Sequence, residues 1–170
     1  MALTINDPVL QKVQGYRCRN AQADNSCAIY ETRPQTCRNF HCGWRRLKWV
    51  RETLRPDISG VLVRMQYEAP DANGARALGV IFTLLNANSW KVEGLAETVA
   101  AAVAAGVPAY VHVPGPPGYT SSQARINDAL HGAVLTRNKP AILEVLRRAR
   151  SMAKQGDHEP IVLGPPEVNG

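Results

Sequence analysis

The sequence is poor in aromatic residues and lacks any long apolar run. Phe, Trp and Tyr make up 6% of the 170 residues, although apolar residues as a whole make up 45%. No stretch approaches the roughly 20 apolar residues that a membrane-spanning helix needs, so we expect no membrane partner. The first residues show neither the basic nor the apolar region of a secretory signal peptide, and this favours a cytoplasmic location.

The residue sets of the common catalytic centres are also missing. The chain shows no Ser/His/Asp arrangement, no paired carboxylates and no glycine-rich loop that would cradle a phosphate. Its one Gly-rich stretch, residues 114–118, contains three prolines, which cannot donate the backbone N–H groups that such a loop requires. The sequence therefore favours a binding protein over an enzyme, with an iron–sulfur redox protein as the enzymatic alternative.

Cysteine is absent after position 42, and all four cysteines lie in one short polar segment. Cys18, Cys27, Cys37 and Cys42 follow the spacing Cys-x8-Cys-x9-Cys-x4-Cys. Four thiolates complete a tetrahedral zinc site or hold an iron–sulfur cluster. In the cytoplasm a cysteine cluster more often binds metal than forms disulfides. The pattern predicts a metal site made by these four residues, with a zinc ion as the first choice and an iron–sulfur cluster as the alternative.

Three other interpretations of the cysteines remain open. They could be buried as small apolar residues, form two disulfides in an oxidising compartment, or include a reactive thiol at Cys37, whose pKa the neighbouring Arg38 would lower. His41 lies between two cysteines, and we expect it to be exposed rather than a ligand. Tyr30, Phe40 and Trp44 form either an apolar shell around a metal or ordinary packing. Arg33 and Arg38 either donate to sulfur and backbone carbonyls or are solvated.

The net charge of +6 comes from the same part of the chain. Residues 12–55 contain ten basic and three acidic residues, whereas residues 56–170 contain ten of each. We favour the interpretation that this positive charge offsets metal-bound thiolates. The alternative is an anionic partner, a nucleic acid or an acidic protein, bound by the basic helix predicted over residues 45–55. That helix would present Arg45, Arg46, Lys48, Arg51 and Arg55, with Trp49 available to stack on a base.

The apolar pattern predicts an α+β fold in one domain over residues 1–170. We expect an irregular cysteine-cluster segment over residues 15–55 and a body over residues 56–164, with a small, mostly antiparallel sheet packed with three to four helices. The expected helices cover 44–54, 91–105, 121–137 and 141–154. The expected strands cover 58–67, 78–85, 107–113 and 160–163, and an Asn-Gly turn at 71–74 joins the first two.

The segment from Cys18 to Trp44 resembles the signature of the YkgJ-type cysteine-cluster family, bacterial proteins described as zinc- or iron-chelating. The matching elements are Cys27, Ile29-Tyr30, Arg33-Pro34, Cys37-Arg38, Phe40, Cys42 and Trp44, with Cys18 upstream and Arg55-Pro56-Asp57 downstream. The resemblance covers residues 18–57 and implies a metal-binding role for the cysteines.

The chain departs from that family in one respect. Family members usually carry a further group of the form Cys-x2-Cys-x-Cys-Cys before this core, and no cysteine precedes Cys18 here. Three explanations stay open. A second site has been lost, the natural start lies upstream, or the four cysteines that are present suffice.

Overall fold

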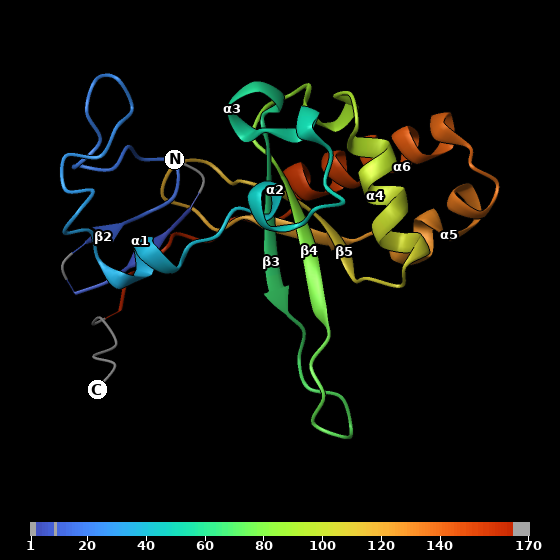
Figure 1. Cartoon of the computed structure of the whole chain (residues 1–170), viewed down its shortest axis with the longest axis horizontal. Coiled ribbons are helices and arrows are strands. Elements are labelled where there is room, and N and C mark those ends of the chain that lie inside the picture. The colour runs from blue at the N-terminus through green and yellow to red at the C-terminus, as the bar shows by residue number, and fades with distance from the viewer. Residues whose placement is uncertain (1–2, 9, 165–170) are drawn as a thin grey trace.

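The computed structural model describes residues 3–8 and 10–164, and these form the α+β fold that the sequence predicts. A four-stranded mixed sheet has three of the helices on one side and the N-terminal segment on the other (Figure 1). The strands of this sheet are β3 (Val61–Tyr67), β4 (Leu78–Leu84), β5 (Ala109–Val113) and β6 (Ser122–Arg125). The covering helices are α4 (Leu95–Ala104), α5 (Asn127–Leu135) and α6 (Lys139–Gln155).

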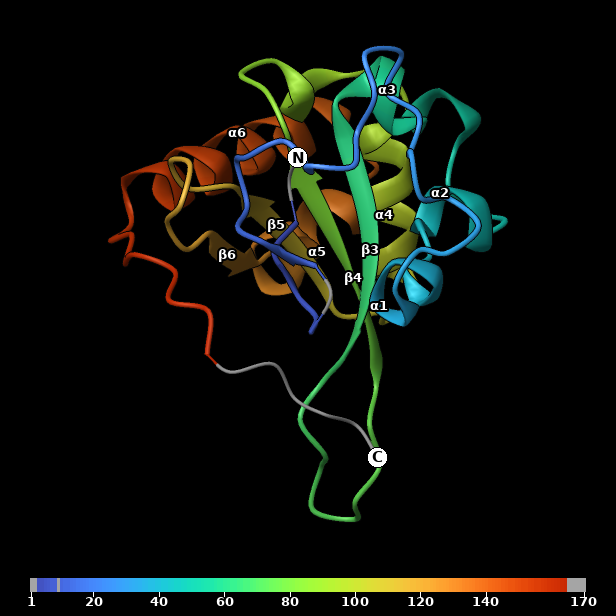
Figure 2. The ribbon, with the colours of Figure 1, turned by 90° about the vertical axis from the view of Figure 1, so that its left-hand side faces the viewer.

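The sheet order is β3-β4-β5-β6, and its outer pairs are antiparallel while β4 and β5 run parallel. The β3–β4 hairpin extends beyond the rest of the sheet (Figure 2). Its turn is closed by a hydrogen bond from the Gly74 N–H to the Asp71 carbonyl, as the Asn-Gly signal predicts. The parallel pair needs a crossover, and α4 supplies it. Two of the three pairings are therefore antiparallel, in agreement with the predicted mostly antiparallel sheet.

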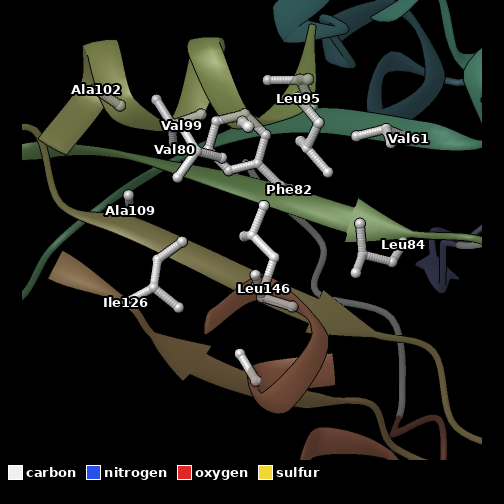
Figure 3. Close-up of a cluster of buried hydrophobic side chains, with 14 of the residues drawn as sticks. Val61, Val80, Phe82, Leu84, Leu95, Val99, Ala102, Ala109, Ile126 and Leu146 are labelled. Carbon is white, nitrogen blue, oxygen red and sulfur yellow. The ribbon is translucent and has the colours of Figure 1, made fainter. Parts of the chain in front are cut away.

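The main core fills the space between the sheet and these helices (Figure 3). Phe82 at the centre of β4 is fully buried, and its register partners are Val63 on β3 and Val111 on β5. The apolar face of α6 repeats at helical spacing and buries Ile142, Leu146, Ala149 and Ala153. Every buried residue of this core cluster lies at or after Val50, so residues 16–42, which contain the four cysteines, contribute none of them.

The N-terminal segment forms its own small structure. It contains a two-stranded antiparallel pair, β1 (Ile5–Asn6) and β2 (Gln11–Lys12), followed by turns and a five-residue helix, α1 (Gln35–Asn39). Buried Gln14 fastens it to the body, because its Oε1 accepts from the Ser121 hydroxyl at 2.5 Å and its amide donates to the Tyr119 carbonyl. The backbone carbonyl of Gln14 also accepts from the Gly118 N–H at 3.1 Å.

The prediction of one helix over 44–54, and with it of a basic helical surface over 45–55, is wrong. The chain forms only α2 (Gly43–Arg46) and a separate 3-10 turn, η1 (Glu52–Leu54), and these are joined by extended and turn residues. The Trp44 indole N–H donates to the Glu52 carbonyl at 3.2 Å and so holds the start of α2 and the start of η1 together. Val50 and Leu54 are still buried, so the apolar spacing identified core residues correctly but assigned them to the wrong backbone.

Two further predictions need correction. Residues 122–125 belong to β6 rather than to a helix, because they pair with β5, and α5 begins only at Asn127. The Asn127 side chain accepts from the Ala109 N–H at 2.8 Å and donates to the Val107 carbonyl at 2.9 Å. Residues 160–163 form a single bridge, Tyr119 with Pro160, instead of a strand. The sequence also missed the short helix α3 (Pro56–Ser59).

None of the described helices combines the length and the apolar character that crossing a bilayer requires.

Candidate functional site in the cysteine segment

Local hydrogen bonds close the loop that contains the first two cysteines. The Ala21 N–H donates to the Cys18 carbonyl at 3.0 Å, and Ala21 forms an antiparallel bridge with Cys27. The Ala28 N–H then donates to the Asn20 carbonyl at 2.8 Å. Cys18 and Cys27 therefore lie at the neck of one loop, although they are separated by eight residues in the sequence.

Arg38 holds the next stretch by donating to backbone carbonyls. Its Nε donates to the Arg33 carbonyl at 2.9 Å and an Nη donates to the Glu31 carbonyl at 2.8 Å. These bonds confirm one of the two roles predicted for this arginine. They fix the turn that leads into α1, the helix that contains Cys37. The Thr36 hydroxyl donates to the Asp7 carboxylate at 2.9 Å and ties α1 to the N-terminal pair of strands.

Cys18 and Cys27 each come within electrostatic range of Cys37. Burial is the main cause that raises the pKa of Cys37, and the negative charges of Cys18, Asp7 and Cys27 raise it further. This shift disfavours a reactive thiolate at Cys37, because a nucleophilic cysteine needs a lowered pKa. Cys42 precedes α2 and lines the same hollow as Cys37. All four cysteines are free and partly buried.

The gathered thiols do not yet have the geometry of a metal site. Within residues 3–8 and 10–164, no group of three or more Cys, His, Asp or Glu side chains is arranged so that it would hold a metal ion as it stands. Simultaneous ligation by Cys18, Cys27, Cys37 and Cys42 requires the loop to close further. The four-ligand site stays a prediction.

The aromatic residues and His41 lie mostly toward solvent. Tyr30 and Phe40 are 59% and 41% exposed, so they do not form a closed apolar shell around the thiols, whereas Trp44 packs against the core. The Arg33 guanidinium stacks on Tyr30, with 3.9 Å between its Cζ and the ring centroid. His41 is exposed, as predicted, and its Nε2 lies 2.9 Å from an Nη of Arg46.

A basic hollow of about 550 Å³ lies beside Cys37 and Cys42. Four arginines line it: Arg33, Arg38, Arg45 and Arg46. No acidic residue is among the described residues that line it, and the Nε of Arg33 is buried without a hydrogen-bond partner among them. Four of the ten basic residues of the segment 12–55 therefore lie beside two of the four thiols.

A second cavity, of about 660 Å³, lies between the N-terminal segment and the edge strand β3. Arg64 from β3 lines it, and its Nε donates to the Thr83 hydroxyl at 3.2 Å. Thr83 pairs in register with buried His112, whose pKa is lowered to about 4 by burial and by Arg64. We did not predict this polar row. The sequence feature that could have revealed it is Arg64, a charged residue between apolar ones in a strand with one buried face.

No protein-family model, no curated protein and no solved structure matches this chain. The resemblance to the YkgJ-type family therefore rests on residues 18–57 alone.

Proposed function

We propose that the protein is a cytoplasmic metal-binding protein that holds one metal ion through its cysteine cluster. The observation that supports this most is that Cys18 and Cys27, at the neck of one loop, both lie within electrostatic range of Cys37 on helix α1. Disordered or purely surface cysteines have no reason to converge in this way. The cytoplasm would keep the thiols reduced and available to a metal.

Zinc is the metal that suits this segment best, and an iron–sulfur cluster is the alternative. Zinc accepts four thiolates in a tetrahedron and needs no redox partner. The surrounding arginines offset the negative charge that such a site carries. Because the thiols are gathered but not in ligating positions, we infer that metal binding and final ordering of the segment occur together.

Metal analysis of protein purified without oxygen tests this proposal. We expect about one zinc per chain and no visible absorption band, and we expect chelation to loosen the cysteine segment. Iron in place of zinc, with thiolate-to-iron charge-transfer absorption that bleaches on reduction, would favour the cluster. Protein that contains neither metal and takes up neither on reconstitution under reducing conditions would contradict the proposal.

The hollow lined by arginines supports a second candidate function, the binding of a nucleic acid. Four guanidinium groups without a lining carboxylate form a strong positive site for phosphates. Because residues 45–55 do not form one helix, this surface is centred on α1 and α2. An acidic protein would meet the same charges.

Binding of labelled random single-stranded DNA at low salt tests the second candidate. Arg45→Gln/Arg46→Gln should weaken binding and reduce the slope of log K against log salt by about 1.4, since each lost phosphate contact changes it by about 0.7. The control Arg125→Gln/Lys154→Gln removes the same net charge from the body. Equal losses in the two double variants, or no DNA binding by the wild type, would contradict this function. Competition by polyglutamate would point to an acidic protein.

A further inference from the structure

The cavity beside β3 has the size and lining of a small-molecule site. Its volume of about 660 Å³ falls within the roughly 300–1,000 Å³ that such sites occupy. Most of the lining is apolar and comes from both the N-terminal segment and the sheet: Ile5, Phe40, Met65, Tyr67, Leu78 and Ile81. The surface therefore suits the apolar body of a ligand.

Arg64 is the one Lys or Arg among the described residues that line this cavity. Its Nε is bound to Thr83, but no carboxylate in the described part of the chain forms an ion pair with it. Burial lowers its pKa, and no acidic group opposes that effect. A guanidinium removed from water without a partner is costly unless an anion pairs with it.

The neighbouring histidine adds no charge at neutral pH. His112 lies next to Thr83 in the sheet, and its lowered pKa of about 4 keeps it neutral. Its Nδ1 is buried and has no hydrogen-bond partner among the residues that the structure describes. Arg64 is partly buried, and its single positive charge in this mainly apolar cavity can balance one negative charge. A monoanion therefore fits better than a phosphate dianion, which would leave one charge uncompensated.

We propose that this cavity binds a small amphipathic carboxylate, whose carboxyl group pairs with Arg64 and whose hydrocarbon part packs against the apolar lining. The planar guanidinium presents parallel N–H groups, which match the two oxygens of a carboxylate. Cys37, one of the proposed metal ligands, also lines this cavity, but the pairing with Arg64 needs no metal, so the carboxylate proposal can be tested on metal-free protein.

Calorimetric titration of the full-length protein with octanoate, 1-octanol and octylammonium tests this site. Octanoate should bind about 10- to 100-fold more tightly than the alcohol, because a charge-assisted bond to a buried guanidinium is stronger than a neutral one. Octylammonium should bind more weakly than either. Equal affinities for octanoate and octanol, or no binding of octanoate, would overturn the proposal.

Substitutions of Arg64 test whether this side chain causes the preference for octanoate. Arg64→Met keeps an unbranched side chain without the charge and should abolish the preference for octanoate over octanol, whereas Arg64→Lys should keep part of it. The control Arg125→Met changes an exposed arginine of β6 and should bind octanoate like the wild type. Thermal unfolding without ligand shows that each variant is folded, and Arg64→Met should be at least as stable as the wild type. A folded Arg64→Met that keeps the preference for octanoate would overturn the assignment.

Discussion

Serine in place of Cys37 is expected to abolish stoichiometric metal binding. Cys37 lies within electrostatic range of Cys18 and Cys27 and shares the basic hollow with Cys42, which connects it to all three of the other proposed ligands. A serine hydroxyl is a much poorer ligand for zinc than a thiolate, because it stays protonated near neutral pH. The measurement is metal content per chain after anaerobic purification, by elemental analysis.

Two matched variants make this result specific. Ser26→Ala changes an exposed residue next to Cys27 and should keep the metal. Cys42→Ser should also lower the metal content, since Cys42 lines the same hollow as Cys37 and is the fourth proposed ligand. Far-ultraviolet circular dichroism should show that the body remains folded in all three variants. A Cys37→Ser protein with wild-type metal content would refute this assignment.

Truncation of Phe82 should cause the largest loss of stability, about 3–5 kcal/mol in the free energy of unfolding. The side chain is fully buried at the centre of β4, among residues of the sheet and of α4 and α6 (Figure 3). Its removal leaves a cavity that a close-packed interior fills only in part. Urea denaturation followed by circular dichroism measures the change.

Tyr67→Ala is the matched control for Phe82→Ala. It removes an aromatic ring from β3 in the same sheet, but that ring is 64% exposed, so the loss should stay below about 1 kcal/mol. Similar losses from the two variants would show that the centre of the core lies elsewhere.

The parts of the fold that the sequence predicts are those in which local signals agree with packing. Strands β3 and β4 have β-branched residues and an Asn-Gly turn between them, and α4 and α6 have apolar residues at helical spacing. The errors occur where residues with helix-like spacing adopt another backbone structure. Residues 44–54 bury their apolar side chains from turns, and residues 122–125 are recruited as an edge strand by β5.

For the candidate site, the sequence could identify the residues involved but not how close their side chains lie. The clustering of the cysteines and of the positive charge was visible in composition and spacing alone. The convergence of Cys37 on the loop neck was not, because it depends on side chain to backbone bonds such as those of Arg38. The cavity at Arg64 was also hidden, since its walls come from residues 3–5, 36–41, 64–67 and 78–81.

The attachment of the N-terminal segment through Gln14 has a consequence for local stability. The buried residues of the main core all lie at or after Val50, so opening the cysteine loop removes no member of that core. Backbone amides in residues 16–42 would then exchange with solvent through local openings, while those of β4 and β5 exchange only when the whole domain unfolds. The cysteine segment thus behaves as a separate, low-stability cooperative unit, free to rearrange around a ligand while the body stays folded.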